Sequence, residues 1–362
     1  MKRENTDNEQ NTSFTPRRSR KQIAHDRQRK LGRRKKFYIS LLIIVLLLFF
    51  GGATYAYHIV HTTQNTINKT YTKTDVKKLR NVSQILKEKK PFSVLILGTD
   101  TGDLGRNYKG RTDTIILATV NPKQKNATLT SIPRDTQVNI PSSQNPYDKI
   151  NAAYTIGGPS TAIKTVQNTL NVPIDYYLLV NMGGLRKVVD AVGGVSVEPT
   201  LTFKYDNVSV KKGHKIKLNG KQALSYARMR HDDPGGDYGR QERQKQIITA
   251  IINKGLTVSS LTTNYSKILK SIEPNIQTDL TYNDMLSIAT NYKDAGKKID
   301  SYVLQGQDAM LNGVSYQVAS PDQKKKTSNN IRNKLGLEKS NSDFNNSSYS
   351  GSTDYSSNNT TY

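Results

Sequence analysis

Arginines set in a few short polar motifs are the residues of this sequence best able to do chemistry. A guanidinium group is always charged and can grip two phosphate oxygens at once. When several arginines occur together with aspartates, the expected target is a pyrophosphate with a divalent cation. The motifs are GRTDT at 110–114, SIPRD at 131–135, YARMR at 226–230 and YGRQERQ at 238–244.

Two aspartates stand where a metal site would form. Asp100 follows a short apolar run at 94–97, and Asp113 precedes the next apolar run. Sites in open α/β sheets form at the carboxyl ends of strands, and a loop of this length can bring both carboxylates together. Two carboxylates with phosphate oxygens and water are a typical Mg²⁺ shell. The pair alone also fits a second interpretation, in which Asp100 caps a turn and Asp113 pairs with Arg111.

The last two arginine motifs are predicted to lie on consecutive helices. Arg228 and Arg230 fall at the end of the first helix. The second is expected to begin near Gly239, with Arg240 in its first turn and Gln244 four residues on, on the same face. Free N–H groups and the helix dipole favour an anion there. A solvated charged face is the alternative, but the preceding glycine-rich DDPGGDYG indicates backbone that approaches a ligand closely.

The composition excludes several classes of site. The chain has no cysteine, which excludes disulfides, thiolate catalysis and cysteine-based metal sites. Its five histidines show no H-E-x-x-H spacing, and no Walker A, G-x-S-x-G or G-x-G-x-x-G motif follows a strand. A zinc hydrolase and an ATP-using enzyme are therefore not indicated. The formal net charge of +25 suits anionic surroundings such as lipid headgroups, although basic charge also aids solubility.

Alternating apolar runs and helical periodicities predict an α/β fold. We expect a single exterior domain with a central mixed β-sheet flanked by helices, preceded by one transmembrane helix. Strands are predicted at 94–97, 114–120, 128–132, 176–180 and 301–304. Helices are predicted at 160–170, 185–192, 222–230 and 281–292, with a long amphipathic one from Gly239 that buries Ile247, Ile248, Ile251 and Ile252.

Composition shifts divide the chain into five segments. They are a basic cytoplasmic tail (1–36), a transmembrane anchor (37–57), a stalk (58–90), a catalytic domain (91–320) and a disordered tail (321–362). The uncharged run at 37–57 has the length that a helix needs to cross a bilayer, and its basic N-terminal flank predicts that the domain lies outside. A cleaved signal peptide is the alternative, but no small-x-small site follows the run. The Lys-, Ser- and Asn-rich C-terminal segment is predicted to bury no core.

Seven motifs in a fixed order carry a family resemblance. They are LGTD (97–100), GRTDTIIL (110–117), SIPRDT (131–136), KINAAY (149–154), NMGGLRKVVDAVGGV (181–195), LNGKQALSYARMR (218–230) and GDYGRQERQKQII (236–248). Together they resemble the LytR-CpsA-Psr (LCP) family of cell-wall enzymes. The likeness is dense over about 91–255 and extends over the domain to about 320.

The resemblance implies a phosphotransferase of Gram-positive envelopes. Such an enzyme moves a glycopolymer, of wall teichoic acid or capsule type, from undecaprenyl pyrophosphate to peptidoglycan. The implied protein is a single-pass type II protein of the cell membrane with an extracellular catalytic domain. Its implied partners are the polyprenyl-pyrophosphate-linked glycopolymer, peptidoglycan and the membrane, with no nucleic acid.

The resemblance also implies roles for individual residues. By motif position, Asp100 and Asp113 match metal ligands for Mg²⁺ (or Mn²⁺). The matched catalytic residues are Arg111, Arg134, Arg228 and Arg230, and the pyrophosphate-binding set adds Arg240 and Gln244. The lipid chain of such enzymes lies in an apolar tunnel, which Leu178, Leu179, Val188 and Val189 would line unless they belong to the sheet core.

The expected reaction is attack by a peptidoglycan sugar hydroxyl on the sugar-proximal phosphorus, with lipid phosphate as the leaving group. Cations would stabilise the charge that builds on the leaving oxygens. The sequence leaves the general base open between Asp135 and Asp237. Two other functions also stay open: a polyprenyl-pyrophosphate phosphatase, and a membrane-bound transcriptional regulator or attenuator whose basic segment 17–36 touches DNA. That segment has no recognisable helix-turn-helix, and the positive-inside rule already accounts for it.

Overall fold

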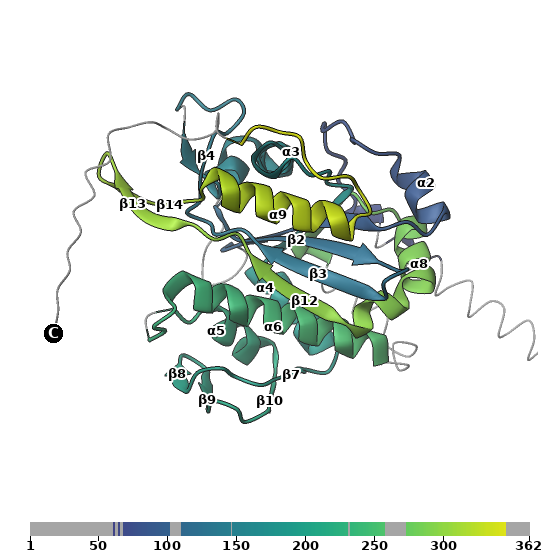
Figure 1. The fold of residues 1–362 in the computed structure, drawn as a ribbon. Coiled ribbons are helices and arrows are strands. Elements are labelled where there is room, and N and C mark those ends of the chain that lie inside the picture. The colour runs from purple at the N-terminus through teal and green to yellow at the C-terminus, as the bar shows by residue number, and fades with distance from the viewer. Residues whose placement is uncertain are drawn as a thin grey trace, which may run out of the picture. The chain divides into compact units, whose positions relative to one another are not determined.

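A six-stranded mixed sheet carries the fold in the computed structural model (Figure 1). The structure describes residues 61, 64–65, 68–101, 110–145, 147–230, 232–257 and 273–344. In order across the sheet, the strands are β11 (Ile276–Thr278), β6 (Tyr176–Asn181), β1 (Phe92–Thr99), β2 (Thr112–Asn121), β3 (Asn126–Ser131) and β12 (Ile299–Val303). β1 pairs antiparallel with β2 and parallel with β6, and β12 runs parallel to β3. The predicted α/β class with a central mixed sheet is confirmed.

Strand β1 is apolar on both faces because helices cover both. Leu95 and Leu97 point to one face and are fully buried, whereas Val94 and Ile96 point to the other and stay half-buried. Strands buried on both faces read as continuous apolar runs. All five predicted strands are present, each within two residues of its observed bounds.

Helices α3 (Ala152–Leu170) and α9 (Pro321–Lys334) cover the face that carries Leu95 and Leu97. Ile163 and Val166 of α3 pack into this main core. The predicted helix at 160–170 is the second part of α3, which begins at Ala152 and bends at Gly157 and Gly158, where the backbone angles are not helical. The first turn of α3 matters for the site, because it points toward the carboxyl ends of β1 and β3.

The prediction of a disordered tail from 321 is wrong for α9. Ser320 caps the helix by accepting a hydrogen bond from Gln323 N, and a proline occupies the first turn. Ile331 and Leu335 are 1% and 3% exposed and belong to the main core. The polar composition hid this helix, because its buried face carries Lys324 and Ser328 before it becomes apolar at Ile331. The predicted domain end at 320 therefore falls too early.

Helices α4 (Met182–Ala191), α5 (Gly220–Arg228) and α6 (Gly236–Thr257) lie on the opposite face of the sheet (Figure 1). α6 packs on two sides: Ile248 contacts the sheet residues Ile116 and Leu129, and Ile247 contacts a second core. That core is formed with α4, α5 and the short strands β7 (Val195–Val197), β8 (Phe203–Tyr205), β9 (Val208–Val210) and β10 (Ile216–Leu218). The predicted isoleucine stripe is thus divided between two neighbours.

The described part of the predicted stalk, residues 68–90, packs onto the domain. α2 (Val82–Lys87) places Ile85 and Leu86 in a cluster with Phe92 and with Tyr292, which follows α8 (Tyr282–Asn291). Upstream, Tyr71 forms a β-bridge with Thr278 of β11. The domain therefore begins before residue 91. Segment 68–90 showed no clear apolar pattern in the sequence, because ion pairs hold much of it in place. The remaining elements are β4 (Gln137–Val138), β5 (Asp148–Lys149), η1 (Glu273–Asn275), η2 (Lys293–Lys297) and a hairpin of β13 (Gln307–Leu311) and β14 (Val314–Val318).

Some predicted segments lie outside the described residues. They are the basic tail at 1–36, the anchor at 37–57 and the end of the tail from 345. In the part of the chain that the structure describes, no helix combines the length and the apolar character needed to cross a bilayer.

Candidate active site

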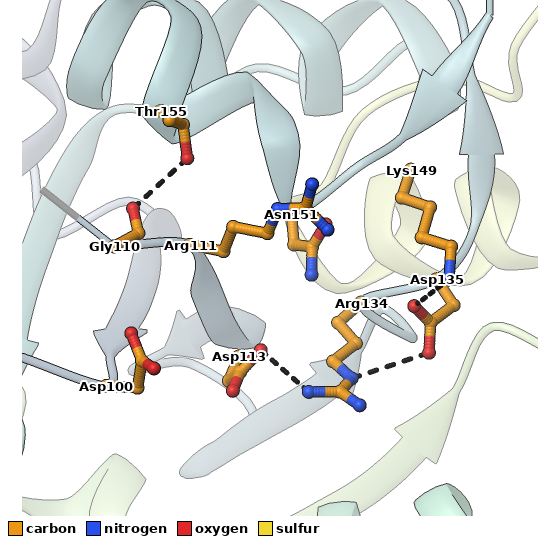
Figure 2. Close-up of a pocket in the computed structure, with 9 residues that line it drawn as sticks. All are labelled: Asp100, Gly110, Arg111, Asp113, Arg134, Asp135, Lys149, Asn151 and Thr155. Carbon is orange, nitrogen blue, oxygen red and sulfur yellow. Dashed lines mark hydrogen bonds and ion pairs between the residues drawn. The ribbon is translucent and has the colours of Figure 1, made fainter.

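A pocket of about 480 Å³ opens at the carboxyl ends of β1 and β3 (Figure 2). Asp100 follows β1, Asp113 is the second residue of β2, and Arg134 lies just beyond β3. The rest of the described lining consists of Gly110, Arg111, Asp135, Lys149, Asn151 and Thr155. Four residues that the sequence assigned to one site, Asp100, Arg111, Asp113 and Arg134, therefore line one pocket.

The backbone at Gly110 brings Asp100 close to the start of β2. Thr155 Oγ1, in the first part of α3, donates to Gly110 O at 3.1 Å. A Cβ atom at Gly110 would overlap Asp100 Oδ1, so any larger residue would displace the Asp100 carboxylate from this position. The glycine of the GRTDT motif thus serves to place the two aspartates at the same pocket.

Arg134 is the most connected cation of the pocket. Its Nη1 donates to Asp113 Oδ1 at 2.9 Å, and its Nε lies 3.4 Å from Asp135 Oδ2. The same Nε lies 3.9 Å from Asp237 Oδ1 on α6. Burial lowers the pKa of Arg134, but the three carboxylates outweigh it and raise that pKa above its ordinary value. Asp113 therefore pairs with Arg134, and not with Arg111 as the alternative interpretation had it.

The start of α6 adds a second arginine beside this cluster. Arg240 is 7% exposed and forms an ion pair with Asp237, whose other oxygen accepts from Gln241 Nε2 at 2.9 Å. Burial lowers the pKa of Arg240, and the positive charges of Arg134 and Arg230 act in the same direction. Arginine nevertheless keeps its charge. The buried guanidinium group of Arg240 and the half-buried one of Arg134 are thus held near each other by the carboxylate between them.

The predicted start of α6 is three residues too late. The helix begins at Gly236, which has φ +51° and therefore suits glycine. Asp237 occupies the first turn, where its negative charge complements the helix dipole. Arg240 therefore lies beyond the first turn. The unpaired backbone N–H groups of the helix start lie in the turn that contains Asp237, and not around Arg240 as predicted.

The structure separates the remaining predicted site residues. α5 ends at Arg228, two residues earlier than predicted, and Met229 is fully buried at its cap. Arg230 is exposed and close enough to Arg240 for its charge to act there. Arg228 and Gln244 are half-buried and are not among the described residues that line the pocket in Figure 2.

Arg243 is a residue that sequence reasoning missed. It is 2% exposed, donates to Asp233 and to Met229 O, and lies 5.6 Å from the Phe203 ring centroid. Asp233 in turn sits against Gly239, where any Cβ atom would overlap its carboxylate. Arg243 thus fixes the loop between Arg230 and α6. No periodicity marked it, because a helix packed on two sides buries polar as well as apolar positions.

Lys149 and Asn151 were part of a recognised motif but received no role from the sequence. Lys149 Nζ lies 2.9 Å from Asp135 Oδ1 and 5.9 Å from the Tyr316 ring centroid on β14. Burial raises the pKa of Asp135, but Lys149 and Arg134 outweigh this and lower it below its ordinary value. Asn151 is 2% exposed, and its Oδ1 accepts no hydrogen bond although the residue stands at the N-cap of α3.

The donor set in the pocket fits a magnesium ion that binds with its substrate. Among the described residues, no group of three or more His, Asp or Glu side chains converges into an all-protein cage. Asp100 and Asp113 nevertheless line one pocket. Mg²⁺ is usually held by one or two carboxylates and completes its octahedron with water and substrate phosphates. Two carboxylates beside a set of arginines match that requirement.

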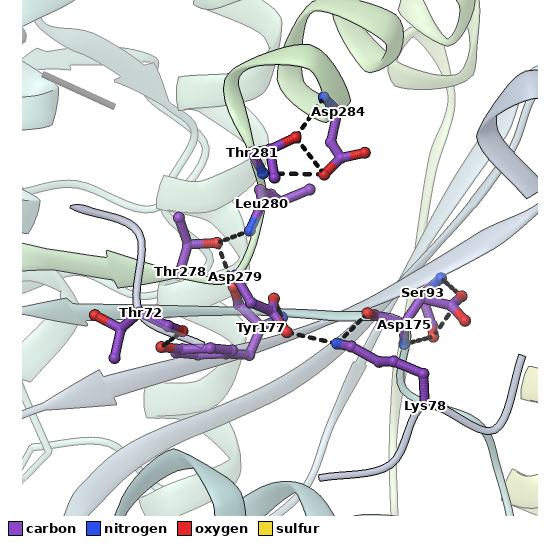
Figure 3. A network of polar contacts seen from close by, with 10 residues as sticks. All are labelled: Thr72, Lys78, Ser93, Asp175, Tyr177, Thr278, Asp279, Leu280, Thr281 and Asp284. Carbon is purple, nitrogen blue, oxygen red and sulfur yellow. Dashed lines mark hydrogen bonds and ion pairs between the residues drawn. The ribbon is translucent and has the colours of Figure 1, made fainter. Parts of the chain in front are cut away.

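A second cluster of charges lies at the other end of β1, and all its groups are satisfied (Figure 3). Asp175 is 1% exposed and accepts from Ser93 N at 2.8 Å and from Arg80. Asp279 accepts from Tyr177 N at 2.9 Å and pairs with Lys78. Each carboxylate therefore ties the segment before α2 to the sheet. Because these groups have partners on every side, we assign the cluster to stability.

Known proteins resemble this chain in sequence and in architecture. A sequence model of the LytR_cpsA_psr family matches residues 54–333. The polyisoprenyl-teichoic acid–peptidoglycan teichoic acid transferase TagU of Enterococcus faecalis is 47% identical over 74% of this chain and 87% of that protein. The crystal structure of B. subtilis TagU is 40% identical, with a TM-score of 0.56 over 69% of this chain and 98% of that one. A structure of TagT bound to LI-WTA is 29% identical, with a TM-score of 0.58 over 72% and 95% of the two chains.

The contacts of Arg243 predict a large loss of stability on its removal. Arg243→Met removes the donor to Asp233 Oδ2 and to the buried Met229 carbonyl, and leaves Asp233 with its hydrogen bond from Gly235 N but without its counter-charge, which should cost about 3–5 kcal/mol. Urea unfolding followed by circular dichroism measures this. Arg243→Lys keeps the charge but reaches one partner only, so we expect an intermediate loss. Equal stability of both variants and the wild type would show that the loop does not depend on this side chain.

The cluster in Figure 3 predicts a similar loss at the far end of the sheet. Asp175→Ala leaves the Arg80 guanidinium and the Ser93 amide without their acceptor and should cost about 3–5 kcal/mol in urea unfolding. Asp294→Ala is the matched control, because Asp294 forms an exposed ion pair with Lys297 and its loss should not change the midpoint measurably. If both variants unfold at the same urea concentration, the buried pair contributes no more than the exposed one.

Proposed function

The chain belongs to the LytR-CpsA-Psr family, and on that premise we propose that it transfers a teichoic acid from a polyisoprenyl pyrophosphate carrier to peptidoglycan. The observation that carries the proposal is the convergence of Asp100, Asp113, Arg111 and Arg134 at one pocket. It is supported by the name of a relative that is 47% identical over most of both chains. A capsule polymer as the cargo has no such support, so teichoic acid is the proposed substrate.

The arginines would hold the pyrophosphate and stabilise the charge that develops during transfer. Arg111 is exposed at the pocket and Arg134 is half-buried, so both present donors to an anion there. Arg240 adds a buried charge from α6, and Arg230 an exposed one from the preceding loop. Phosphoryl transfer depends mainly on positioning and on such charge stabilisation. Arg228 and Gln244 are proposed as further pyrophosphate ligands on motif position alone.

Asp100 and Asp113 are the residues that would hold Mg²⁺ or Mn²⁺. When bound, the ion would neutralise negative charge on the pyrophosphate oxygens. Three cationic side chains and three carboxylates line the described pocket, so its own charges nearly cancel. A pyrophosphate therefore needs additional positive charge, which supports both the metal and the arginines of the α5–α6 loop.

The polyprenyl chain would lie between the sheet and the helices on its α6 face. Of the four residues expected to line the tunnel, Leu179 and Val189 are 6% and 0% exposed and belong to the two cores, so we do not propose them as lipid contacts. Leu178 and Val188 are half-buried and stay in the proposal. Leu178 pairs in register with Ile96 of β1, which is also half-buried. Apolar side chains that remain partly open on an otherwise covered face are suited to contact a lipid.

The proposed setting is the cell membrane, with one N-terminal anchor at 37–57 and the domain on the outside. This rests on the uncharged run and its basic flank in the sequence. The regulator alternative depended on residues 17–36, which lie outside the described residues. The phosphatase alternative differs from the proposal only in the nucleophile, so an assay with and without an acceptor separates the two.

Transfer itself is the first expected outcome. Full-length protein incubated with a polyprenyl-pyrophosphate-linked teichoic acid and peptidoglycan should form a phosphodiester-linked conjugate, detected by mass spectrometry after muramidase digestion. Conjugate should form with Mg²⁺ and disappear after chelation, and Asp100→Ala should require more Mg²⁺. The control omits peptidoglycan. Release of lipid phosphate without any conjugate would identify a pyrophosphatase instead.

The arginines predict a loss of transfer without a loss of fold. Arg111→Lys keeps the charge but not the planar pair of donors, and Arg111→Ala removes both. A hydrogen bond to a charged group is worth about 1.5–3 kcal/mol, so Arg111→Ala should reduce transfer about ten- to a hundredfold, and Arg111→Lys somewhat less. Lys297→Ala, an exposed cation on η2, is the control. Normal transfer by Arg111→Ala would remove this arginine from the site.

A further inference from the structure

Two carboxylates near Arg134 compete for the role of general base, and the structure distinguishes them. Asp237 Oδ1 is buried and paired with Arg240, and its Oδ2 accepts from Gln241 Nε2 at 2.9 Å. Asp237 is also not among the described residues that line the pocket. Both of its oxygens are therefore committed to α6, and it serves to hold the arginines.

Asp135 has the opposite surroundings. It lines the pocket, and its side chain is 23% exposed. One oxygen lies 2.9 Å from Lys149 Nζ and the other 3.4 Å from Arg134 Nε. A carboxylate oxygen has room for more than one hydrogen bond. Figure 2 shows the two partners that hold Asp135 in place. The carboxylate can therefore also accept a donor from a ligand in the pocket.

The backbone of Asp135 is fixed from three directions. Thr136 N donates back to Pro133 O at 3.0 Å, and Ile150 N donates to Thr136 O at 2.8 Å. On the other side, Gln317 N of β14 donates to Asp135 O at 2.9 Å. The Gln317 side chain in turn accepts from Tyr238 Oη at 2.8 Å on α6. A base held this firmly can be aimed at one position in the pocket.

We propose that Asp135 is the general base that takes the proton of the acceptor hydroxyl, and that Lys149 is the positioning residue that orients its carboxylate. This inference rests on the proposed function, since the acceptor is the peptidoglycan hydroxyl of that reaction. The hydroxyl oxygen forms a bond to the phosphorus that carries the polymer. The bond from that phosphorus to the bridging oxygen breaks, and lipid phosphate leaves with the electron pair. The hydroxyl proton passes to Asp135 and then to solvent through the open pocket.

The charges around Asp135 keep it ready to accept a proton at neutral pH. Arg134 on its own loop and Lys149 on β5 lower its pKa below the ordinary value, against the effect of burial. Asp113 of β2 and Asp237 of α6 lie beyond Arg134, and Tyr316 of β14 lies beside Lys149. Asp100 and Arg111 line the same pocket. A carboxylate with a lowered pKa is a weak base, but in phosphoryl transfer an aspartate commonly takes the hydroxyl proton.

Substitution of Asp135 tests the proposal directly. General-base catalysis contributes about 10²- to 10⁴-fold, so Asp135→Asn should lower kcat for transfer by at least about a hundredfold. Its affinity for the lipid pyrophosphate, measured by equilibrium binding, should not decrease. Asp237→Asn is the matched comparison: it disturbs Arg240, so it should raise KM for the lipid substrate more than it lowers kcat. A wild-type kcat for Asp135→Asn would overturn the proposal.

Substitution of Lys149 tests its positioning role through the pH profile of kcat, which a merely structural role would not change. Lys149→Met removes a cation that favours the ionised carboxylate, so the pKa of Asp135 should rise. The acid limb of the pH profile of kcat should then shift to higher pH, while Lys149→Arg should keep it near the wild-type position. An acid limb that stays in place in Lys149→Met contradicts the proposal, even if Asp135→Asn fails to fold.

The same variants separate this inference from the proposed function. If the wild-type protein forms no conjugate but hydrolyses the lipid pyrophosphate, the proposed acceptor is wrong, and water is the nucleophile. The base is then tested on hydrolysis: a hundredfold loss in Asp135→Asn supports Asp135, and an unchanged rate excludes it.

Discussion

The site depends on carboxylates that hold its arginines together. Arg134 and Arg240 repel each other, and Asp237 lies between them with a contact to each. Asp113 and Asp135 compensate the rest of the charge on Arg134. Asp113 comes from β2, Asp135 from the loop after β3, and Asp237 and Arg240 from α6. The ion pairs therefore also join α6 to the sheet edge where β1 and β3 end. They add to the packing of Ile248 against the sheet and bring the two halves of the proposed pyrophosphate site together.

The position of α6 explains why so much charge is buried there. Ile248 faces the sheet and Ile247 faces the second core, so the helix has little surface left for solvent. Arg243 is accordingly buried, but with Asp233, a carbonyl and an aromatic ring as partners. A buried charge is tolerated only with such compensation. The same contacts fix the loop that carries Arg230. The packing of α6 therefore also positions the proposed pyrophosphate ligands.

The sequence predicted those parts of the structure that leave a strong local pattern. β1, β2 and β6 are continuous apolar runs. The place of Asp100 followed from the rule that sites form at carboxyl ends of strands, and that of Asp113 from the length of the loop between β1 and β2. α9 was missed because its lysines and asparagines dominate the composition, while only residues such as Ile331 and Leu335 dock it. Lys149 and the hairpin that carries Tyr316 were missed because their contacts join residues far apart in the chain. No local signal distinguished Asp135 from Asp237, since the difference lies in which oxygens α6 already occupies.

Charge balance connects the metal aspartates to the arginines in the proposed reaction. The described pocket is lined by as many carboxylates as cations, which allows it to fold without a bound anion. The same balance gives it little net attraction for a pyrophosphate. Asp113 now accepts from Arg134. If a phosphate oxygen took the place of that acceptor, Asp113 would be available to hold a divalent cation, whose charge would offset that of the pyrophosphate. On this argument the anion and the cation would each complete the other's site, and the exposed Arg230 would add positive charge beside Arg240.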